Sequence, residues 1–277
     1  MASTSPKISR TSLHARSVSL PSRPHPTVPE YDEILCRLKS SDSASSSSSS
    51  IRNHLDGLQD LHTFVDSRLM LLPETQKALA KECSGKWVDE VLDVSLRLLD
   101  VCGTAKDSLL MTKECVQELQ SSLRRKGSDS KEAAGKYLAG RKAVKKLIQK
   151  ALRNLKGLQT TKNEQDSCFT VSMLREVEKV TLSALESLLS FVSGPKDQSL
   201  VSKLMLSKSS KSESTSEFEQ IDASMQSIVK HKTVGIDNIR ADVADLSLNI
   251  EDLESGVECL YRHLIKTRVT ILNIVSN

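Results

Sequence analysis

The chain has 277 residues, 38% of them hydrophobic and 27% charged, which is enough for one large domain or two small ones with a buried core. Aromatic residues make up only 3%, so Leu, Val and Ile must build that core, which favours helices over a β-sandwich. The formal net charge of +4 is too small to indicate a nucleic-acid-binding protein by itself. No stretch reaches the roughly 18–20 apolar residues of a membrane span.

Residues 1–50 have the composition of a segment that does not fold. Five of the seven prolines lie here, and the segment ends in a run of serines from Ser45 to Ser50. Such a segment cannot bury enough apolar surface to offset its ordering entropy. The first acidic residue is Glu30. We interpret residues 1–50 as a disordered basic arm of a cytoplasmic protein; the alternative is a plastid or mitochondrial transit peptide.

A short motif lies within this arm. Arg16, Ser17, Ser19 and Pro21 form the pattern R-S-x-S-x-P, and an Arg three residues before a serine suits basophilic kinases. Phosphorylated Ser19 would present three acceptor oxygens and close to two negative charges to an Arg cluster. The pattern predicts a phosphosite at Ser19 that is bound by a 14-3-3 protein, although serine-rich arms also match it by chance.

Helical periodicity begins at Ile51, where apolar residues recur at steps of three and four and share one face. They are Leu55, Leu58, Leu61, Val65, Leu69 and Leu72. Pro73 is expected to end this helix and to open the next. His54 and His62 lie eight residues apart, which is too wide for a metal pair, so we expect both on the surface.

A long helix is predicted from about Lys86 to Lys126, after a break at Ser84-Gly85. Its apolar positions alternate by four and three, and three of them are small: Ser95, Cys102 and Ala105. Small residues at these positions allow a neighbouring helix to approach closely.

Three further helices are predicted in the next hundred residues. A basic helix runs from about Ser130 to Leu158, and another runs from about Ser167 to Val192 and ends at Gly194-Pro195. A polar linker follows, and Ser216 with Glu219 fits a capping box for the third helix.

The last helix is the most regular element, with a seam of twelve positions, eleven of them apolar, that alternate by three and four from Ile236 to Ile274. Such a seam favours two-stranded packing. We expect it to pack inside the chain, against the helix at 86–126, with Leu253 and Leu260 fully buried. Further apolar residues beside the seam predict several neighbours at the end of this helix; they are Tyr261, Ile265, Val269, Leu272 and Val275. The predicted fold class is all-α: an elongated bundle of long antiparallel helices (51–277) behind the disordered N-terminal arm (1–50).

No catalytic signature is present: there is no G-x-G-x-x-G, P-loop, H-E-x-x-H, G-x-S-x-G or C-x-x-C. We therefore predict no catalytic, cofactor-binding or metal-binding residue, and a protein that is not an enzyme. The six cysteines are far apart, and we interpret them as reduced, buried thiols in a reducing compartment.

The basic helix carries the candidate binding face. Between Glu132 and Glu164 there are nine bases and no acid. The candidate anionic-partner face consists of Lys142, Lys145, Lys146, Lys150 and Arg153. Such a face can bind anionic lipid headgroups or an acidic protein. Nucleic acid is disfavoured, because only Tyr137 is available to stack on a base. The alternative is an ordinary surface whose bases meet acids on neighbouring helices.

Several segments together resemble the plant BYPASS-like family. They are residues 72–79 (LPETQKAL), 95–103 (SLRLLDVCG), 119–125 (LQSSLRR) and 264–269 (LIKTRV), with residues 16–26 of the arm. The resemblance is colinear over nearly the whole chain, although residues 62–65 (HTFV) differ from many relatives. It implies a plant-specific helical protein associated with root and shoot development. It implies no catalytic residues and no particular compartment. We therefore expect a helical interaction protein, or alternatively a peripheral membrane module that uses the basic helix.

Overall fold

The computed structural model describes residues 27–41, 47–81, 87–125, 129–156, 169–194, 216–230 and 235–276. Within these ranges the protein is helical and contains no strand, so the predicted all-α class is confirmed. The predicted arm before residue 27, including Ser19, and the predicted break at Ser84-Gly85 lie outside the described residues.

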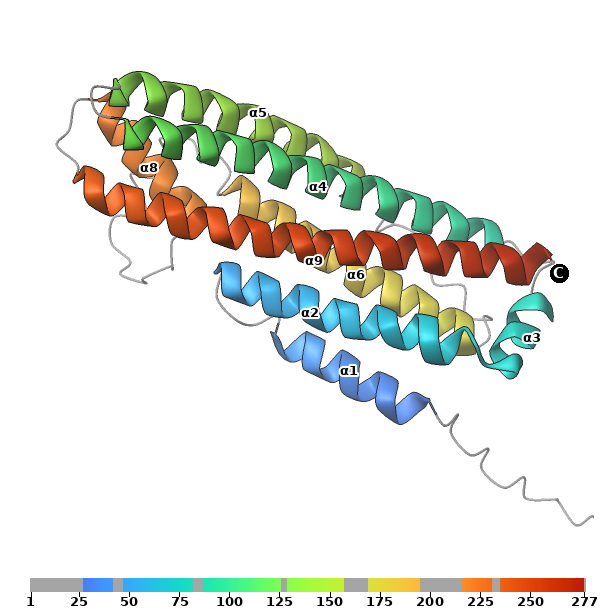
Figure 1. Cartoon of the computed structure of the whole chain (residues 1–277). Coiled ribbons are helices and arrows are strands. Elements are labelled where there is room, and N and C mark those ends of the chain that lie inside the picture. Colours follow the sequence, from blue (N-terminus) through green and yellow to red (C-terminus); the bar gives the residue numbers. More distant parts are fainter. Residues whose placement is uncertain are drawn as a thin grey trace, which may run out of the picture.

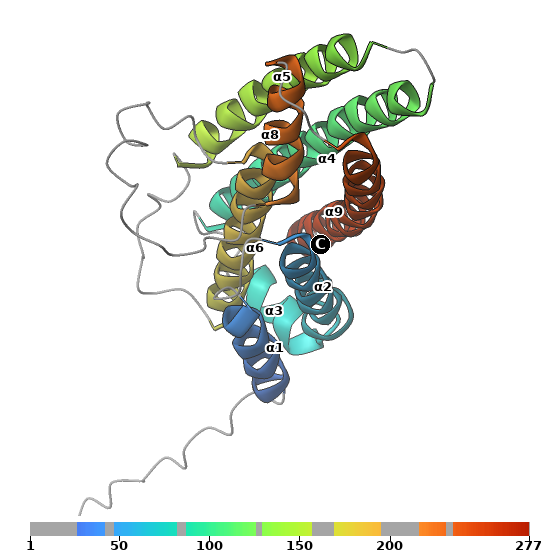
Figure 2. The same cartoon turned by 90° about the vertical axis from the view of Figure 1, so that its left-hand side faces the viewer.

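The helices form an elongated bundle, with the long ones side by side along its length (Figure 1). Viewed along the bundle, α5 and α1 lie at opposite edges, with α4, α9, α6 and α2 between them (Figure 2). The elements are α1 (Val28–Ser41), α2 (Ser48–Phe64), the π-helix η1 (Val65–Leu69), α3 (Pro73–Lys81), α4 (Trp87–Arg124), α5 (Ser130–Lys156), α6 (Phe169–Ser193), α8 (Glu217–Val229) and α9 (Ile236–Ser276).

Helices α4 and α9 form an antiparallel pair at the centre of the bundle. The guanidinium of Arg268 donates to the carbonyl oxygen of Leu92 near the start of α4. The guanidinium of Arg240 donates to the carbonyl oxygen of Leu123 at its end. Between them, the thiol of Cys102 donates to the carbonyl oxygen of Val257 over 3.7 Å, because a small residue lets the backbones approach. The predicted seam of α9 is thus packed inside the chain.

Burial along α9 follows the predicted seam. Leu253 and Leu260 are each 1% exposed, as expected. The further buried residues of α9 are Ile239, Val243, Leu246, Ile250, Val257, Leu264 and Ile271. Ile236, the first residue of the seam, is exposed.

The end of α9 has several neighbours, as predicted, but they cover only part of its apolar surface. It contacts α3 and η1 as well as α4, and Tyr261 and Val275 pack against the core. Ile265 (41% exposed), Val269 (48%) and Leu272 (38%) face solvent, and no helix among the described residues covers them.

The folded part also begins earlier than residue 51. Helix α1 packs against the core through Tyr31, Ile34, Leu35 and Leu38, which are all buried. Pro29 is compatible with this helix because it lies in the first turn, where the missing N–H would have no partner. The predicted domain boundary at residue 50 was therefore too late.

Even the serine run is partly structured. The hydroxyl of Ser47 accepts from the backbone N–H of Ser50 over 3.2 Å, so it caps α2, and Ser48–Ser50 form the first turn. Serine is a good N-cap because its oxygen satisfies a backbone donor at the helix start.

Two predicted helix ends are confirmed. The hydroxyl of Ser216 accepts from the backbone N–H of Glu219 over 3.3 Å and caps α8. Gly194 follows α6 with φ of 70°, a conformation that glycine adopts without steric cost.

Candidate functional site

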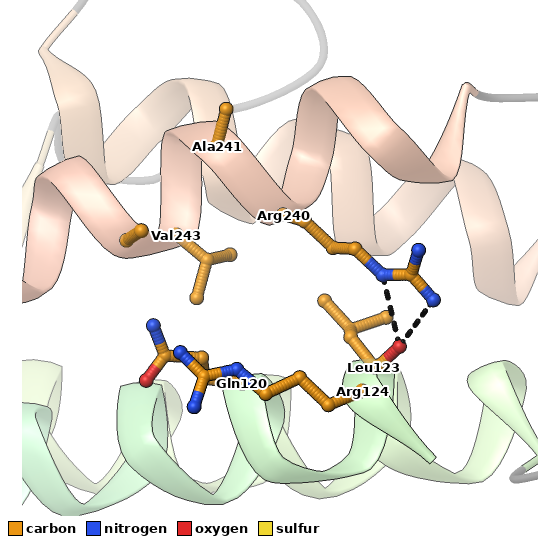
Figure 3. Close-up of a pocket in the computed structure, with 7 residues that line it drawn as sticks. Gln120, Leu123, Arg124, Arg240, Ala241 and Val243 are labelled. Carbon is orange, nitrogen blue, oxygen red and sulfur yellow. Dashed lines mark hydrogen bonds between the residues drawn. The ribbon is translucent and has the colours of Figure 1, made fainter. Parts of the chain in front are cut away.

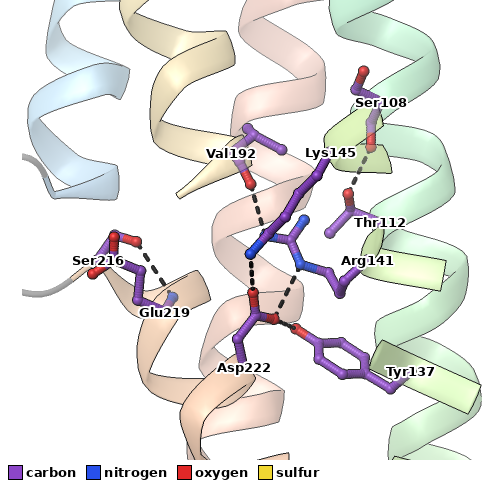
Figure 4. Close-up of polar contacts among 9 residues, drawn as sticks. All are labelled: Ser108, Thr112, Tyr137, Arg141, Lys145, Val192, Ser216, Glu219 and Asp222. Carbon is purple, nitrogen blue, oxygen red and sulfur yellow. Dashed lines mark hydrogen bonds and ion pairs between the residues drawn. The ribbon is translucent and has the colours of Figure 1, made fainter. Parts of the chain in front are cut away.

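The inner face of α5 holds a buried ionic network. Asp222 of α8 accepts at Oδ1 from the Nε of Arg141 over 3.2 Å and from the hydroxyl of Tyr137 over 3.0 Å. Its Oδ2 pairs with the Nζ of Lys145 at 3.0 Å. Arg141 also donates from Nη2 to the carbonyl oxygen of Val192, near the end of α6, over 2.7 Å. Figure 4 shows these groups converging between α5, α6 and α8.

This network joins three helices at one carboxylate. Arg141 is 1% exposed, and its guanidinium lies 5.0 Å from the centre of the Phe218 ring. Burial, together with the negative charge of Asp222, raises the pKa of Tyr137, so its hydroxyl remains a donor. The Nη1 of Arg141 has no hydrogen-bond partner among the described residues. Because its charges are paired with one another across three helices, we interpret the network as structural.

The outer face of α5 carries the rest of the predicted site. Lys142, Lys146, Lys150 and Arg153 are exposed, and no acidic side chain in the described part of the chain forms an ion pair with them. Their spacing of four, four and three places them on one stripe of the helix. We call these four residues the α5 cationic stripe.

Lys145 does not belong to this stripe. It was predicted as part of the anionic-partner face, but its ammonium is paired with Asp222 and is only half-exposed. The alternative interpretation, bases that meet acids on neighbouring helices, therefore applies to Lys145 and Arg141. The helical period separates them from the stripe, because each lies one residue before a stripe member, a rotation of roughly 100° around the helix.

A second polar cluster, which the sequence did not predict, surrounds the π-helix. Asp66, whose side chain is 1% exposed, binds the Nδ1 of His263 at 2.7 Å and the hydroxyl of Thr267 at 2.9 Å. The Nζ of Lys266 lies 3.6 Å from the same carboxylate. The π-helical bond from the N–H of Met70 to the carbonyl oxygen of Val65 inserts an extra residue into the turn. Asp66 lies in the first turn of this π-helix and faces α9.

His62 is buried, at 2% exposed, and not on the surface as predicted; His54 is buried as well. The hydroxyl of Thr181 donates to the carbonyl oxygen of Val177 over 2.7 Å, so it can only accept from His62 Nε2, at 2.9 Å. His62 therefore carries its proton on Nε2. Burial, followed by the nearby His263, lowers the pKa of His62 to about 4, against the opposing effect of Asp66.

His62 and Glu178 line a small internal cavity between α2, α4, α6 and α9. Its volume is about 30 Å³, and its walls are otherwise mainly apolar. A polar cavity of more than roughly 10–15 Å³ can hold a water molecule. The enclosed position of the Glu178 carboxyl raises its pKa to about 8, although Arg175 acts in the opposite direction. At neutral pH this carboxyl is therefore mostly protonated.

Replacing Glu178 by Gln is expected to stabilise the protein increasingly as the pH rises. The folded-state pKa of about 8 lies above the ordinary value of 4.5, so the folded state retains a proton that the unfolded state has lost. Wild-type stability then falls with rising pH across this window, by at most about 1.4 kcal/mol per pH unit. Urea unfolding at several pH values measures the difference. Glu186→Gln, on the same helix but outside the cavity, is the control, and a difference that is independent of pH for both variants would contradict the prediction.

A larger hollow, of about 230 Å³, lies where α4 ends beside the start of α9. Figure 3 shows Gln120 and Arg124 on the α4 side and Arg240 opposite them. Arg240 donates from Nε and Nη2 to the carbonyl oxygen of Leu123, over 3.0 and 2.6 Å. This carbonyl is one of the unpaired acceptors at a helix end, so Arg240 caps α4 and fastens it to α9.

Four cysteines lie in the described residues, and all four are free. Cys102 is buried as expected, and burial raises the pKa of its thiol to about 12, which leaves it unreactive. Cys36 is exposed, which contradicts the prediction for that residue.

No group of three or more His, Cys, Asp or Glu side chains in the described ranges is arranged to hold a metal ion. None of the described helices is both long and apolar enough to cross a membrane.

Comparison with known proteins identifies the family. The model of the family described as Protein BPS1 matches residues 54–274, from the first half of α2 nearly to the end of α9. No curated protein and no solved structure matches the chain. Because the family model covers most of the chain, including α4, α5 and α9, the resemblance to BYPASS-like proteins is confirmed, and the chain belongs to the BPS1 family.

Proposed function

We propose that this protein is a non-enzymatic interaction protein of plant root and shoot development, which binds an acidic partner protein through the α5 cationic stripe. Membership of the BPS1 family supports the developmental role. The binding role is supported by one observation: Lys142, Lys146, Lys150 and Arg153 are exposed on one face without an ion-pair partner among the described residues.

Other bases of α5 have ion-pair partners, which the four residues of the stripe lack among the described residues. On the inner face, Arg141 and Lys145 are both paired with Asp222. At the start of the helix, Lys136 is paired with Glu132 at 2.7 Å. Four like charges on one stripe repel one another at the spacing of one helical turn, by a few tenths of a kcal/mol per pair. An acidic partner would remove this repulsion and release bound counterions.

Neutralising the stripe should abolish most of the binding to an acidic partner. The variant changes Lys142, Lys146, Lys150 and Arg153 to Gln, and the probe is a Glu-rich peptide measured by fluorescence anisotropy. Exposed ion pairs contribute roughly 0.2–1 kcal/mol each, so four of them should weaken binding by about tenfold or more. Binding should also weaken with added salt, which screens exposed charges.

The control removes the same amount of charge elsewhere. Arg68, Lys77, Lys81 and Lys179 are exposed bases on η1, α3 and α6, and changing all four to Gln should leave binding within about twofold. Equal loss in both variants would show that net charge, and not the stripe, drives binding. In plants that lack the protein, the stripe variant should fail to restore root growth while the control variant restores it.

A second candidate function is binding to an anionic membrane surface, which the same stripe favours. A base near an anionic bilayer contributes about 1 kcal/mol, and the contribution disappears beyond a Debye length. Co-sedimentation with phosphatidylserine vesicles separates the two candidates. Vesicle binding that is lost in the stripe variant, together with no binding to the acidic peptide, would favour the membrane over a protein partner.

A further inference from the structure

An apolar patch is exposed where the start of α4 lies beside the end of α9. On α9, Ile265, Val269 and Leu272 are 38–48% exposed and are separated by steps of four and three, so they share one side of the helix. On α4, Leu96 is 47% exposed. We call Leu96, Ile265, Val269 and Leu272 the α4–α9 patch. Single exposed apolar residues are ordinary, whereas four on adjoining helices form a surface that water solvates poorly.

Polar contacts between the two helices place the first turns of α4 beside the end of α9. Arg268 donates to the carbonyl oxygen of Leu92 and, over 2.7 Å, to the hydroxyl of Ser95, which directly precedes Leu96. One turn before Arg268 on the same side of α9 is Ile265, and one turn after it is Leu272. These contacts set the α4 edge of α9 against the first turns of α4.

The same edge continues toward the middle of the helices. The ammonium of Lys106 lies 4.5 Å from the centre of the Tyr261 ring. Between this contact and Leu96 lies Gly103, where an added Cβ would meet no atom within 4 Å. The surface beside the patch is therefore open, and another backbone can approach it closely.

Opposite charges border the patch on its two sides. Exposed acids recur along the outer side of α4 at steps of four, seven and seven: Asp89, Asp93, Asp100 and Asp107. Arg97 lies on the same side and pairs with Asp93, so this side keeps a net negative charge. On the outer side of α9, Arg262 and Lys266 are exposed, at 76% and 62% of their side chains, beside Glu258 and the buried Asp66. No acidic residue follows Glu258 in the sequence. Across the surface from α4 to α9, an acidic strip is thus followed by the apolar patch and then by a basic strip.

This order is complementary to itself in only one of two possible pairings. A two-fold axis that runs parallel to α4 and α9 places α4 of one copy over α9 of the other, so acids face bases on both sides. An axis that runs across the helices places acids over acids. An isologous interface needs a self-complementary surface, and the parallel axis provides one. A membrane fits less well, because the acids of α4 would face lipid headgroups.

We propose that the α4–α9 patch is the interface of a homodimer whose two-fold axis runs parallel to these helices. Because α4 and α9 are antiparallel, with Lys106 beside Glu258 and Tyr261, Asp100 lies level with Arg262 along the bundle. In the dimer, Asp100 faces the partner subunit's Arg262. The apolar residues of the patch occupy the centre, and the charge pairs border it, which is the usual anatomy of a protein interface.

Light scattering after size-exclusion chromatography of the full chain tests the proposal. The wild type should elute with twice the 30.5 kDa mass of one chain. Ile265→Glu places a charge at the centre of the interface and should weaken dimerisation by at least about tenfold. Leu248→Glu is the control, because Leu248 is 62% exposed on the same helix but outside the patch. Circular dichroism should show that both variants retain the wild-type helix content.

A charge exchange tests the direction of the axis. Asp100→Arg alone should weaken the dimer by about two- to fivefold, and adding Arg262→Asp should restore it. The proposal would be overturned if the wild type remained monomeric at about 100 µM. It would also be overturned if Ile265→Glu left the dimer intact. A dimer that Ile265→Glu disrupts but that the charge exchange does not restore would overturn the parallel axis.

Discussion

Replacing Asp222 by Ala is expected to lower the free energy of unfolding by about 3–5 kcal/mol, because the change leaves a buried cation without its counter-charge. Arg141 is 1% exposed, and Asp222 is the acid with which it pairs. The hydroxyl of Tyr137 loses its acceptor in the same step. Urea denaturation followed by circular dichroism measures the effect, which is a large part of the 5–15 kcal/mol stability typical of a domain.

Two further variants distinguish the effect of disrupting the ionic network from the effect of removing any one carboxylate. Asp237→Ala removes an exposed carboxylate that pairs with Arg240 on the surface, and it should change the stability by less than about 0.5 kcal/mol. Replacing Arg141 by Met together with Asp222→Ala removes both charges, and it should recover part of the loss. If Asp222→Ala costs no more than Asp237→Ala, the network does not hold α5, α6 and α8 together.

Replacing Leu253 by Ala is expected to cost about 2–5 kcal/mol, because the deletion leaves a cavity in a close-packed seam. Leu253 lies at the middle of α9 and is 1% exposed. Nearby, Lys113 of α4 pairs with Glu254 at 2.7 Å, which shows that the two helices are in contact at this level. Thermal unfolding together with urea denaturation measures the loss.

The matched control is Leu248→Ala on the same helix. Leu248 is exposed, so its truncation removes little buried surface and should change the stability by less than about 0.5 kcal/mol. An unchanged stability in Leu253→Ala would mean that the seam is not part of the core. Conversion of a dimer into a folded monomer by this variant would mean that the seam, and not the α4–α9 patch, joins two molecules.

The sequence predicted the long helices well because their periodicity is a local property of the chain. The ranges expected for α4, α5, α6 and α9 agree with the structure to within about two residues at each end. The steps of three and four in α9 also identified its buried side. Antiparallel packing of α4 on α9 followed from their similar lengths and their matching seams.

Other features were missed because the local signal pointed the wrong way. The prolines and serines around α1 have the composition of a disordered segment, and contacts with distant helices, such as those of Tyr31 and Leu38, stabilise this helix. His62 lies four residues after Leu58 and three before Val65, a spacing that indicates the buried face, and its polar type alone led to the surface prediction. Its partner Thr181, 119 residues away, could not be predicted from the sequence. Neither residue type nor spacing predicts the π-helix or the contact between Asp66 and His263.

For the candidate site on α5, the sequence indicated the residue types, but the fold decided which of these residues are available. Its concentration of bases was visible in the sequence, as was the absence of acids between Glu132 and Glu164. Which bases are available for a partner depended on where Asp222 lies, and this residue comes from a helix about 80 positions further along the chain. Asp222 forms an ion pair with Lys145, whereas Lys142 and Lys146 remain exposed.

By itself, the amino-acid sequence therefore determined the helical class, the long elements and the buried side of each, because hydrophobic periodicity acts between residues three and four apart. The tertiary structure alone decided which polar groups are paired and which apolar residues stay uncovered. Ile265 and Leu253 belong to the same helix and are both apolar, yet one faces solvent and the other is enclosed by α4. The physical reason is that a side chain's burial depends on which distant helix lies over it, and chain topology, not local composition, places that helix.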